Sequence, residues 1–171
     1  MSRTRRALGA ALAVAAAAAS CAYTTSTALL PSHLKTVAVP VFENGTTEYT
    51  LEQDVTDAVI AAFIADNHLK VVDERSAHAV LKGRITSYRN AVFGFSQTAQ
   101  AQEYRVTIGI SVTFKDQVKN RQLWTEPNMV KTANYYVVNT PGDSARTELD
   151  GRKQAIAKLA EEIIARSVEG W

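Results

Sequence analysis

The side chain with the clearest chemical potential is that of Cys21, the only cysteine in a chain of 171 residues. It follows a basic stretch at Met1–Arg6 and an apolar run of 13 residues at Ala7–Ala19. A charged start, a short apolar stretch and small residues before a cleavage point are typical of a secretory signal. The run is too short for a membrane-spanning helix, which needs about 20 residues. Because a lone thiol in an exported protein has no intramolecular disulfide partner, we predict that the sulfur of Cys21 carries lipid.

The residues around Cys21 resemble the bacterial lipobox, although Ala18 stands where that motif usually has Leu. The resemblance implies a multiply acylated Cys21, with palmitate among its lipids, and a permanent tether, because a single acyl chain binds a membrane only reversibly. Ala22 stands where an Asp favours inner-membrane retention, so outer-membrane sorting is expected. An ordinary cleaved leader with an incidental thiol is the alternative. Thr4–Leu8 also has a short resemblance to a twin-arginine signal.

Removal of the leader changes the charge of the chain. The 20 leader residues include three Arg, and the 151 residues that remain have 16 basic and 17 acidic side chains, a net charge of −1. This balance lacks the positive excess of nucleic-acid-binding domains, so we predict no nucleic-acid partner. A chain of this length can bury about 70% of its unfolded surface in one domain. The expected organisation is a signal peptide at 1–20, the lipidated cysteine and a tether at 21–34, and a single domain at 35–171.

The other residue types that could do chemistry are scattered. His33, His68 and His78 fall on the tether, a turn and a loop, without the spacing of metal ligands. Asp54 and Asp57 could act as paired carboxylates, but without a nearby histidine they fit a solvated helix face better. The sequence has no glycine-rich phosphate loop after a strand and no serine in a G-x-S-x-G elbow. We therefore predict that the protein is not an enzyme and holds no metal, and no cofactor beyond its covalent lipid.

The first half of the expected domain predicts a strand, a helix and a second strand. Thr36–Phe42 is nearly apolar and rich in β-branched residues, which indicates a buried strand. Thr50 and Gln53 have the spacing of a capping box at a helix start. The apolar stripe of that helix is Leu51, Val55, Ala58, Val59, Ala62 and Phe63. The remaining segments are a turn at Asn44-Gly45, a helix end at residues 66–68, a short extended segment at Lys70–Val72 and a strand at Ala79–Tyr88.

The clearest pattern in the second half is a strict alternation from Tyr104 to Lys115, which predicts a strand with one covered and one polar face. The apolar set is Tyr104, Val106, Ile108, Ile110, Val112 and Phe114. The other segments are a strand end with a long hairpin loop at 89–102, a strand at Gln122–Val138 broken or bulged near Pro127, and a helix at Ser144–Ser167 with the stripe Leu149, Ile156, Leu159, Ala160, Ile163 and Ile164. The order β-α-β-β-β-α predicts an α+β two-layer sandwich, a sheet of about four strands with two helices on one face.

Three features resemble LptE, the lipopolysaccharide-assembly lipoprotein family of Gram-negative outer membranes. The first is the anchor Cys21-Ala22-Tyr23 with its polar tether, where the family often has Gly in place of Ala22. The second is the stretch from Ser87-Tyr88-Arg89-Asn90 through Ser96-Gln97-Thr98-Ala99 to Glu103-Tyr104-Arg105-Val106. The third is the order of elements. The match covers essentially all of the chain after the leader, and it has no catalytic signature.

This resemblance implies a lipoprotein held by its anchor on the periplasmic side of the outer membrane. It also implies that the chain plugs a large β-barrel translocon similar to LptD and binds lipopolysaccharide during transport to the cell surface. A polar sheet face with spaced basic residues suits both partners, since basic side chains form charge-assisted hydrogen bonds with the phosphates of lipid A. Our hypothesis is that Arg89, Arg105 and Lys131 make these contacts; for each, a solvated surface charge is the alternative.

A second class of protein fits the same start of the chain. Periplasmic lipoproteins that regulate cell-wall synthesis, or that form part of a secretion pore, share a strand-helix-strand start like Val37–Ser87. Pore formers need long amphipathic hairpins, and Tyr104–Val138, interrupted by Pro127, fits lipid poorly. A barrel partner would favour the first class, and a cell-wall synthase or a homo-oligomeric ring the second.

Overall fold

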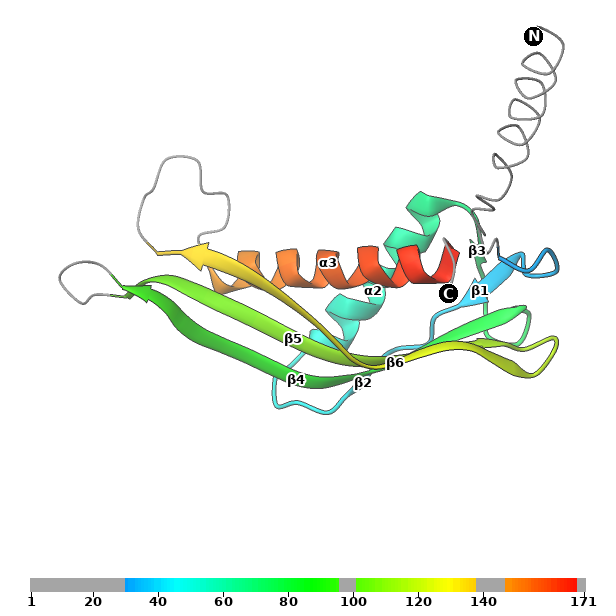
Figure 1. The fold of residues 1–171 in the computed structure, drawn as a ribbon, viewed down its shortest axis with the longest axis horizontal. Helices are drawn as coiled ribbons and strands as arrows, with labels where there is room; N and C mark the ends of the chain where they lie inside the picture. Colours follow the sequence, from blue (N-terminus) through cyan, green and yellow to red (C-terminus); the bar gives the residue numbers. More distant parts are fainter. Residues whose placement is uncertain (1–29, 96–100, 138–146, 169–171) are drawn as a thin grey trace, which may run out of the picture.

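The computed structural model describes residues 30–95, 101–137 and 147–168, which form a sheet and two helices (Figure 1). The strands are β1 (Thr36–Ala38), β2 (Glu43–Asn44), β3 (Lys70–Val71), β4 (Ala79–Phe95), β5 (Ala101–Asp116) and β6 (Arg121–Tyr136). The helices are α2 (Leu51–Asp66) and α3 (Glu148–Val168). The predicted α+β class is confirmed. The predicted leader and the lipidation site at Cys21 lie outside the described residues.

The sheet has six strands in the order β3-β1-β4-β5-β6, and β2 pairs separately with β4. β1 is parallel to both β3 and β4, whereas β4, β5 and β6 form an antiparallel meander. The predicted number of about four strands was too low. The difference is the pair of two-residue strands, β2 and β3, which exist only because neighbouring backbone pairs with them. Asn44, predicted in a turn, pairs with Ile85 of β4, and the turn follows at Gly45.

Helix α2 begins at Leu51, as predicted, but the predicted capping box is wrong. Thr50 has a left-handed backbone, with φ of 64°, and its side chain makes no capping hydrogen bond. The Thr50 carbonyl instead accepts from the backbone N–H groups of Gln53 and Asp54, at 3.1 and 3.0 Å. The Gln53 amide donates to Asp57 at 3.4 Å. The helix ends at Asp66, as expected, and Asn67 follows in the left-handed conformation that commonly closes a helix.

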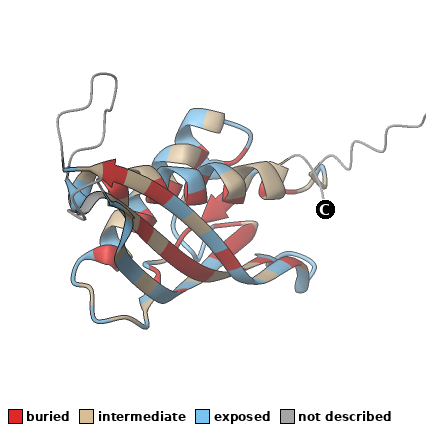
Figure 2. Ribbon diagram, turned by 60° about the vertical axis from the view of Figure 1, so that its left-hand side comes forward, coloured by how far each residue is buried: buried red, intermediate tan, exposed pale blue. Residues whose placement is uncertain are grey.

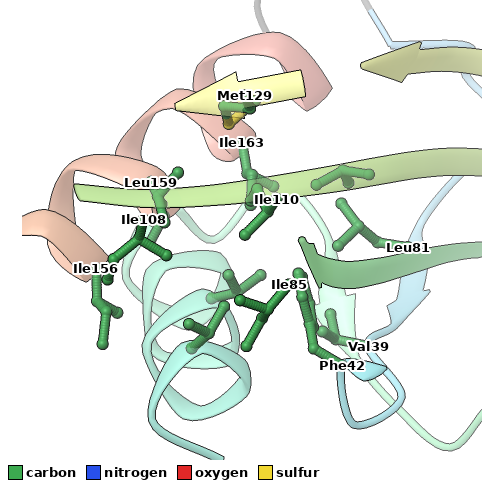
Figure 3. Close-up of a cluster of buried hydrophobic side chains, with 14 of the residues drawn as sticks. Val39, Phe42, Leu81, Ile85, Ile108, Ile110, Met129, Ile156, Leu159 and Ile163 are labelled. Carbon is green, nitrogen blue, oxygen red and sulfur yellow. The ribbon is translucent and has the colours of Figure 1, made fainter. Parts of the chain in front are cut away.

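Both helices pack on one face of the sheet and bury the predicted apolar stripes (Figure 3). Ile108 and Ile110 of β5 meet Phe63 of α2 and Leu159 and Ile163 of α3 in one core. Burying a side chain of this size contributes about 1.5–3 kcal/mol to stability. This core fixes which face of the long strands stays open. Leu149 is an exception to the predicted stripe, because it lies at the exposed start of α3.

A glycine allows α3 to approach the sheet closely. Gly151 is buried, and a Cβ atom there would come within 3.0 Å of the Tyr135 ring and 3.2 Å of the Val106 side chain. A glycine costs a helix interior about 1 kcal/mol, and the close approach explains why one is present. The Tyr88 hydroxyl also donates to Glu148 at 2.6 Å, so the start of α3 lies over the middle of β4. Its contact at Tyr135 lies near the end of β6.

The hairpin strands extend beyond the start of α3 (Figure 1). β4 continues to Phe95 and β5 begins at Ala101, so the predicted long hairpin loop is shorter than expected. Register shifts interrupt the β4–β5 pairing near Gly94, and a further shift in β6 spans Pro127, where a bulge was predicted. The end of the meander around and beyond the start of α3 is a three-stranded arm, which we call the distal arm (residues 88–95, 103–107 and 132–137). The first turns of α3 cover its base at Val106 and Tyr135.

Candidate functional site

The face of the sheet opposite the helices is open and polar, as the alternation predicted. Buried and exposed residues alternate along the long strands (Figure 2). Val106 and Ile108 are fully buried under the helices, so Thr107 between them lies on the open face. Its cross-strand partners, Arg89 of β4 and Thr132 of β6, lie on that face too. Cross-strand pairing therefore assembles the candidate site from three strands.

Arg105 of β5 is the most firmly positioned cation of this face. Its guanidinium carbon lies 3.3 Å from the centroid of the Phe93 ring, a cation–π stack. Its Nε donates to Asn134 of β6 at 2.8 Å, and the Asn134 amide in turn donates to Glu103 at 2.6 Å. Glu103 also accepts from Tyr136 at 3.1 Å. Among the described residues, no hydrogen bond or ion pair occupies the terminal nitrogens of Arg105. These donors are therefore available and held in a fixed direction.

Arg89 lies diagonally across from Arg105 on the same face. It pairs with Thr107, two residues further along β5, and its side chain is exposed. Within the described part of the chain it has no ion-pair partner. By contrast, Arg84 on the same face pairs with Glu43 at 3.2 Å. The distal arm thus carries two cations to which no carboxylate of residues 30–95, 101–137 or 147–168 is bonded.

Lys131 is not part of this pair. It lies opposite Ile108, on the helix-covered face, and its amine is 3.3 Å from a carboxylate oxygen of Glu162 in α3. Arg166 also bonds Glu162, at 2.8 Å. The hydrogen bonds from Arg166 and then Lys131 lower the pKa of Glu162, although burial opposes them. The structure therefore brings Arg89 and Arg105 together and places Lys131 in an ion-pair network that fastens α3 to β6.

The distal arm also exposes large apolar side chains, which the sequence did not single out. Val92, Phe93, Phe95 and Val137 are between 41 and 67% exposed. A group of exposed apolar side chains on an otherwise polar protein surface is typical of a binding site. Phe93 takes part in both features, because it carries the Arg105 stack. The signal in the sequence was the low charge of the stretch around Phe93-Gly94-Phe95.

The remaining titratable candidates have structural partners. Asp54 lies 3.8 Å from Arg152, and His68 lies 2.9 Å from Asp66. His33 bonds the buried Asp116 at 2.7 Å. Over residues 30–95, 101–137 and 147–168, no group of three His, Cys, Asp or Glu residues has the arrangement of a metal site. In the same residues, neither helix is long and apolar enough to cross a membrane.

The described residues form an α+β sandwich with a polar open sheet face, two arginines on that face and exposed apolar side chains at one end. The family model of LptE, lipopolysaccharide-assembly, matches residues 34–167. The chain therefore belongs to the LptE family. This family consists of non-enzymatic lipopolysaccharide-assembly lipoproteins, and it does not depend on a cofactor. The prediction that the protein is not an enzyme is confirmed by this membership.

Solved structures share the fold at low sequence identity. Protein XCC0632 from Xanthomonas campestris matches with a TM-score of 0.56 and 10% identity, over 82% of this chain and 90% of that one. The hypothetical protein CT253 from Chlamydia trachomatis matches with 0.54 and 12% identity, over 78 and 95%. Uncharacterized lipoprotein B from Nitrosomonas europaea matches with 0.50 and 13% identity, over 85 and 90%. No curated protein matches the chain. At these identities the likeness concerns the fold alone.

Proposed function

We propose that this protein is an outer-membrane lipoprotein, acylated on Cys21 and facing the periplasm, that plugs a β-barrel translocon similar to LptD. In this role it binds lipopolysaccharide during delivery to the cell surface. Membership in the lipopolysaccharide-assembly family supports the pathway. A wet barrel lumen suits the polar open face, and the exposed apolar arm offers a surface that a partner would cover.

The observation that carries the ligand proposal is the Arg89–Arg105 pair. Phe93 and Asn134 hold the Arg105 guanidinium, while its terminal nitrogens have no bonded partner among the described residues. A guanidinium presents donors in a fork that matches phosphate oxygens, and fixing it in advance reduces the entropy lost on binding. Phosphates of lipid A are the anions we assign to it. Apolar contacts with acyl chains would come from Phe93 and Phe95 beside it.

Binding of purified lipopolysaccharide to the Arg89→Gln/Arg105→Gln variant tests this assignment. A charge-assisted hydrogen bond contributes about 1.5–3 kcal/mol, and less on an exposed, solvent-screened face. We therefore expect the two arginines together to contribute about 1.5–3 kcal/mol, so that the affinity falls roughly 10- to 100-fold. Arg84→Gln is the matched control, because Arg84 lies on the same face but is neutralised by Glu43. We expect it to bind within about twofold of the unmodified protein. Equal affinity of the double variant and the control would remove the two arginines from the ligand site.

Lys131 belongs to the same proposal, but its surroundings give it a separate test. Its ion pair with Glu162 competes with any ligand phosphate. We therefore expect Lys131→Gln to weaken lipopolysaccharide binding less than the Arg89/Arg105 variant. A larger loss for Lys131→Gln, with the thermal unfolding midpoint unchanged, would move the ligand site to the helix-covered side of β6.

The barrel partner is tested by affinity purification of the full-length protein from detergent-solubilised outer membrane. Recovery of a large β-barrel protein in about equal amount is the expected result. Recovery of a cell-wall synthase, or of a homo-oligomeric ring alone, would support the regulatory or pore-forming class instead.

The anchor is tested by the intact mass of the protein purified from membranes. We expect loss of 20 leader residues and a mass increase corresponding to several acyl chains, both abolished by Cys21→Ala. An unmodified thiol at Cys21 would overturn the anchor and leave the ligand-binding result untouched.

A further inference from the structure

The end of the fold opposite the distal arm is where the chain from Cys21 enters. Leu30 packs against the core and Leu34 is buried, so the fold begins there. His33 Nε2 lies 2.7 Å from Asp116 Oδ2, which fixes the entering chain beside the turn that joins β5 to β6. Asp116 has no exposed side-chain surface. The entry point and this turn are therefore neighbours although they are 83 residues apart in sequence.

The β5–β6 turn combines exposed basic and apolar side chains. Lys115, Lys119 and Arg121 are exposed, and Val118 between them is 60% exposed. Across the described residues, neither Lys115 nor Lys119 is bonded to a carboxylate. The one carboxylate of the turn, on Asp116, is buried and accepts from the Lys119 backbone N–H at 3.0 Å as well as from His33. Its Oδ2 also lies 3.8 Å from the Nε of Arg121, so Arg121 is the one cation of the turn with a carboxylate partner among the described residues.

Two more lysines belong to elements at the same end: Lys35 directly precedes β1, and Lys70 is the first residue of β3. Figure 1 shows β1 and β3 on the side of the β5–β6 turn. The Lys35 N–H donates to His78 at 3.1 Å, and the Lys70 N–H donates to the Lys35 carbonyl at 3.0 Å. The His78 carbonyl accepts from Gln117 of the turn at 2.8 Å, which connects these lysines to it. We call Lys35, Lys70, Lys115, Val118, Lys119 and Arg121 the basal collar.

The carboxylates near the collar do not neutralise its positive charge. Asp66 is bonded to His68 at 2.9 Å, and Glu74 is bonded to Lys82 at 2.9 Å. Asp73 is the exposed acidic residue that remains beside β3. The collar therefore presents five cations and one exposed apolar side chain. Four of the cations, all lysines, have no carboxylate partner among the described residues, whereas Arg121 lies 3.8 Å from Asp116. This leaves a local excess of positive charge, although the chain after its leader carries a net charge of −1.

We propose that the basal collar docks on anionic phospholipid headgroups of the bilayer that holds the anchor. This inference rests on the proposed acylation of Cys21. Leu30 is nine residues after Cys21, and nine steps of roughly 3.3 Å span at most about 30 Å, so the collar stays near the bilayer surface. Basic residues are attracted to anionic lipid within a Debye length of about 10 Å. Val118 enters the headgroup region while the lysine amines remain at its polar edge.

Docking in this way orients the molecule. The collar and the distal arm lie at opposite ends of the long strands β4 and β5 (Figure 1). With the collar on the headgroups, the arm with Arg89 and Arg105 lies at the far end of the long strands from the lipid that the collar contacts. The lipid anchor alone limits how far the domain lies from the bilayer, and docking of the collar would also fix how the domain is oriented on it.

The first test measures flotation of the chain from residue 21 to 171, with Cys21→Ser to remove the lipid, on vesicles of phosphatidylglycerol and phosphatidylcholine. We expect binding to mixed vesicles at low salt and none to pure phosphatidylcholine. Each basic residue near an anionic surface contributes about fivefold at low ionic strength, so Lys115→Gln/Lys119→Gln/Arg121→Gln should weaken binding roughly 100-fold.

The matched control is Arg84→Gln/Arg89→Gln/Arg105→Gln, which removes the same number of charges away from the collar. We expect it to bind within about threefold of the parent chain. Equal losses for the two triple variants would show a response to net charge alone, and absence of binding to anionic vesicles would overturn the docking proposal outright.

The second test uses the fact that Cys21 is the only cysteine. In the Cys21→Ser background, Val118→Cys or Phe95→Cys gives a single site for an environment-sensitive fluorophore. We expect a blue shift on anionic vesicles for the label at position 118 and none for the label at position 95. The reverse pattern would place the distal arm on the bilayer and overturn the proposal.

The collar and the ligand proposal fail separately. The collar variant should bind lipopolysaccharide with the affinity of the parent chain, because Arg89 and Arg105 are unchanged. Loss of lipopolysaccharide binding in that variant would show that the collar and the Arg89–Arg105 site bind the same ligand. It would overturn the proposal that the collar is a separate lipid-docking surface. A parent chain that binds anionic vesicles but not lipopolysaccharide would sustain the collar and reject the ligand proposal.

Discussion

The two ends of β4, β5 and β6 differ in what covers them. Towards the β5–β6 turn, the strands are covered by the helices and β4 is flanked by β1, and Leu81, Ile110 and Phe114 are fully buried. In the distal arm, the same strands continue past α3, and Phe93 and Phe95 are more than half exposed. Both ends are rich in apolar residues. The two ends have similar apolar side chains, but the helices fully cover only one of them. Whether a helix packs on the strands, and not which residues they contain, therefore separates the part that stabilises the fold from the part available to a partner.

The ends also differ in how their charges are arranged. Towards the tether, the buried Asp116 holds the entering chain through His33. In the arm, Phe93 and Asn134 position Arg105 without a bonded carboxylate among the described residues. A buried charge with partners stabilises a junction, whereas a positioned cation without one is available for an anion.

Two phenylalanines give the largest expected contrast. Phe63 of α2 is fully buried in the core and Phe95 of the arm is 67% exposed. Phe63→Ala should lower the free energy of unfolding by about 3–5 kcal/mol, through lost burial and the cavity left behind. Phe95→Ala should change it by less than about 0.5 kcal/mol. Urea unfolding followed by circular dichroism measures both values.

Phe63→Leu is the milder variant if Phe63→Ala does not fold. It keeps most of the apolar volume and should lose less than the alanine variant. A loss at Phe95 equal to that at Phe63 would show that the arm is packed as a core in the whole protein, and the contrast between the ends would be wrong.

The contact between His33 and Asp116 predicts an intermediate, pH-dependent effect on the free energy of unfolding. Burial alone would raise the pKa of Asp116, but hydrogen bonds from the Lys119 N–H and from His33, with the charge of His33, lower it below its ordinary value of 3.8. A lowered carboxyl pKa stabilises the fold above the unfolded-state pKa of about 3.9, and this stability is lost as pH falls through the folded-state pKa. Asp116→Asn should therefore lose about 2 kcal/mol at pH 7. The difference should begin to narrow below about pH 4 and close only as pH falls through the lower folded-state pKa.

Asp66→Asn is the matched control for this junction. Its partner His68 is exposed, so the ion pair should contribute less than about 0.5 kcal/mol. Urea unfolding at pH 7 and at pH 3.5 distinguishes the two aspartates. A difference at Asp116 that is constant over this range would contradict the linkage to its ionisation.

Alternation and stripe spacing predicted the core well. Val106, Ile108, Ile110, Val112 and Phe114 are all buried as expected, because a period of two is imposed by the pleated strand itself. The same alternation of apolar and polar residues also predicted the open polar face.

Features that depend on distant backbone were not predictable in this way. Strand β2 is a strand only because it pairs with β4. Thr50 has a left-handed backbone, and its side chain makes no capping hydrogen bond. The face of Lys131 depends on register, since β6 gains an extra residue between Glu126 and Met129, around Pro127. The stack of Arg105 on Phe93 likewise needs the irregular pairing near Gly94.

The smallest expected effect distinguishes the two faces of the sheet. Lys131→Glu would place a third carboxylate beside Glu162 and Glu126, where Arg166 alone would bond them, so we expect a loss of about 1 kcal/mol after solvent screening. Arg89→Glu should change stability by less than about 0.5 kcal/mol, because Arg89 is exposed and has no ion pair within the described residues. Urea unfolding at low and at 1 M salt measures both, and salt should narrow the gap between them. A greater loss for Arg89→Glu would mean that the open face, too, contributes to the stability of the fold.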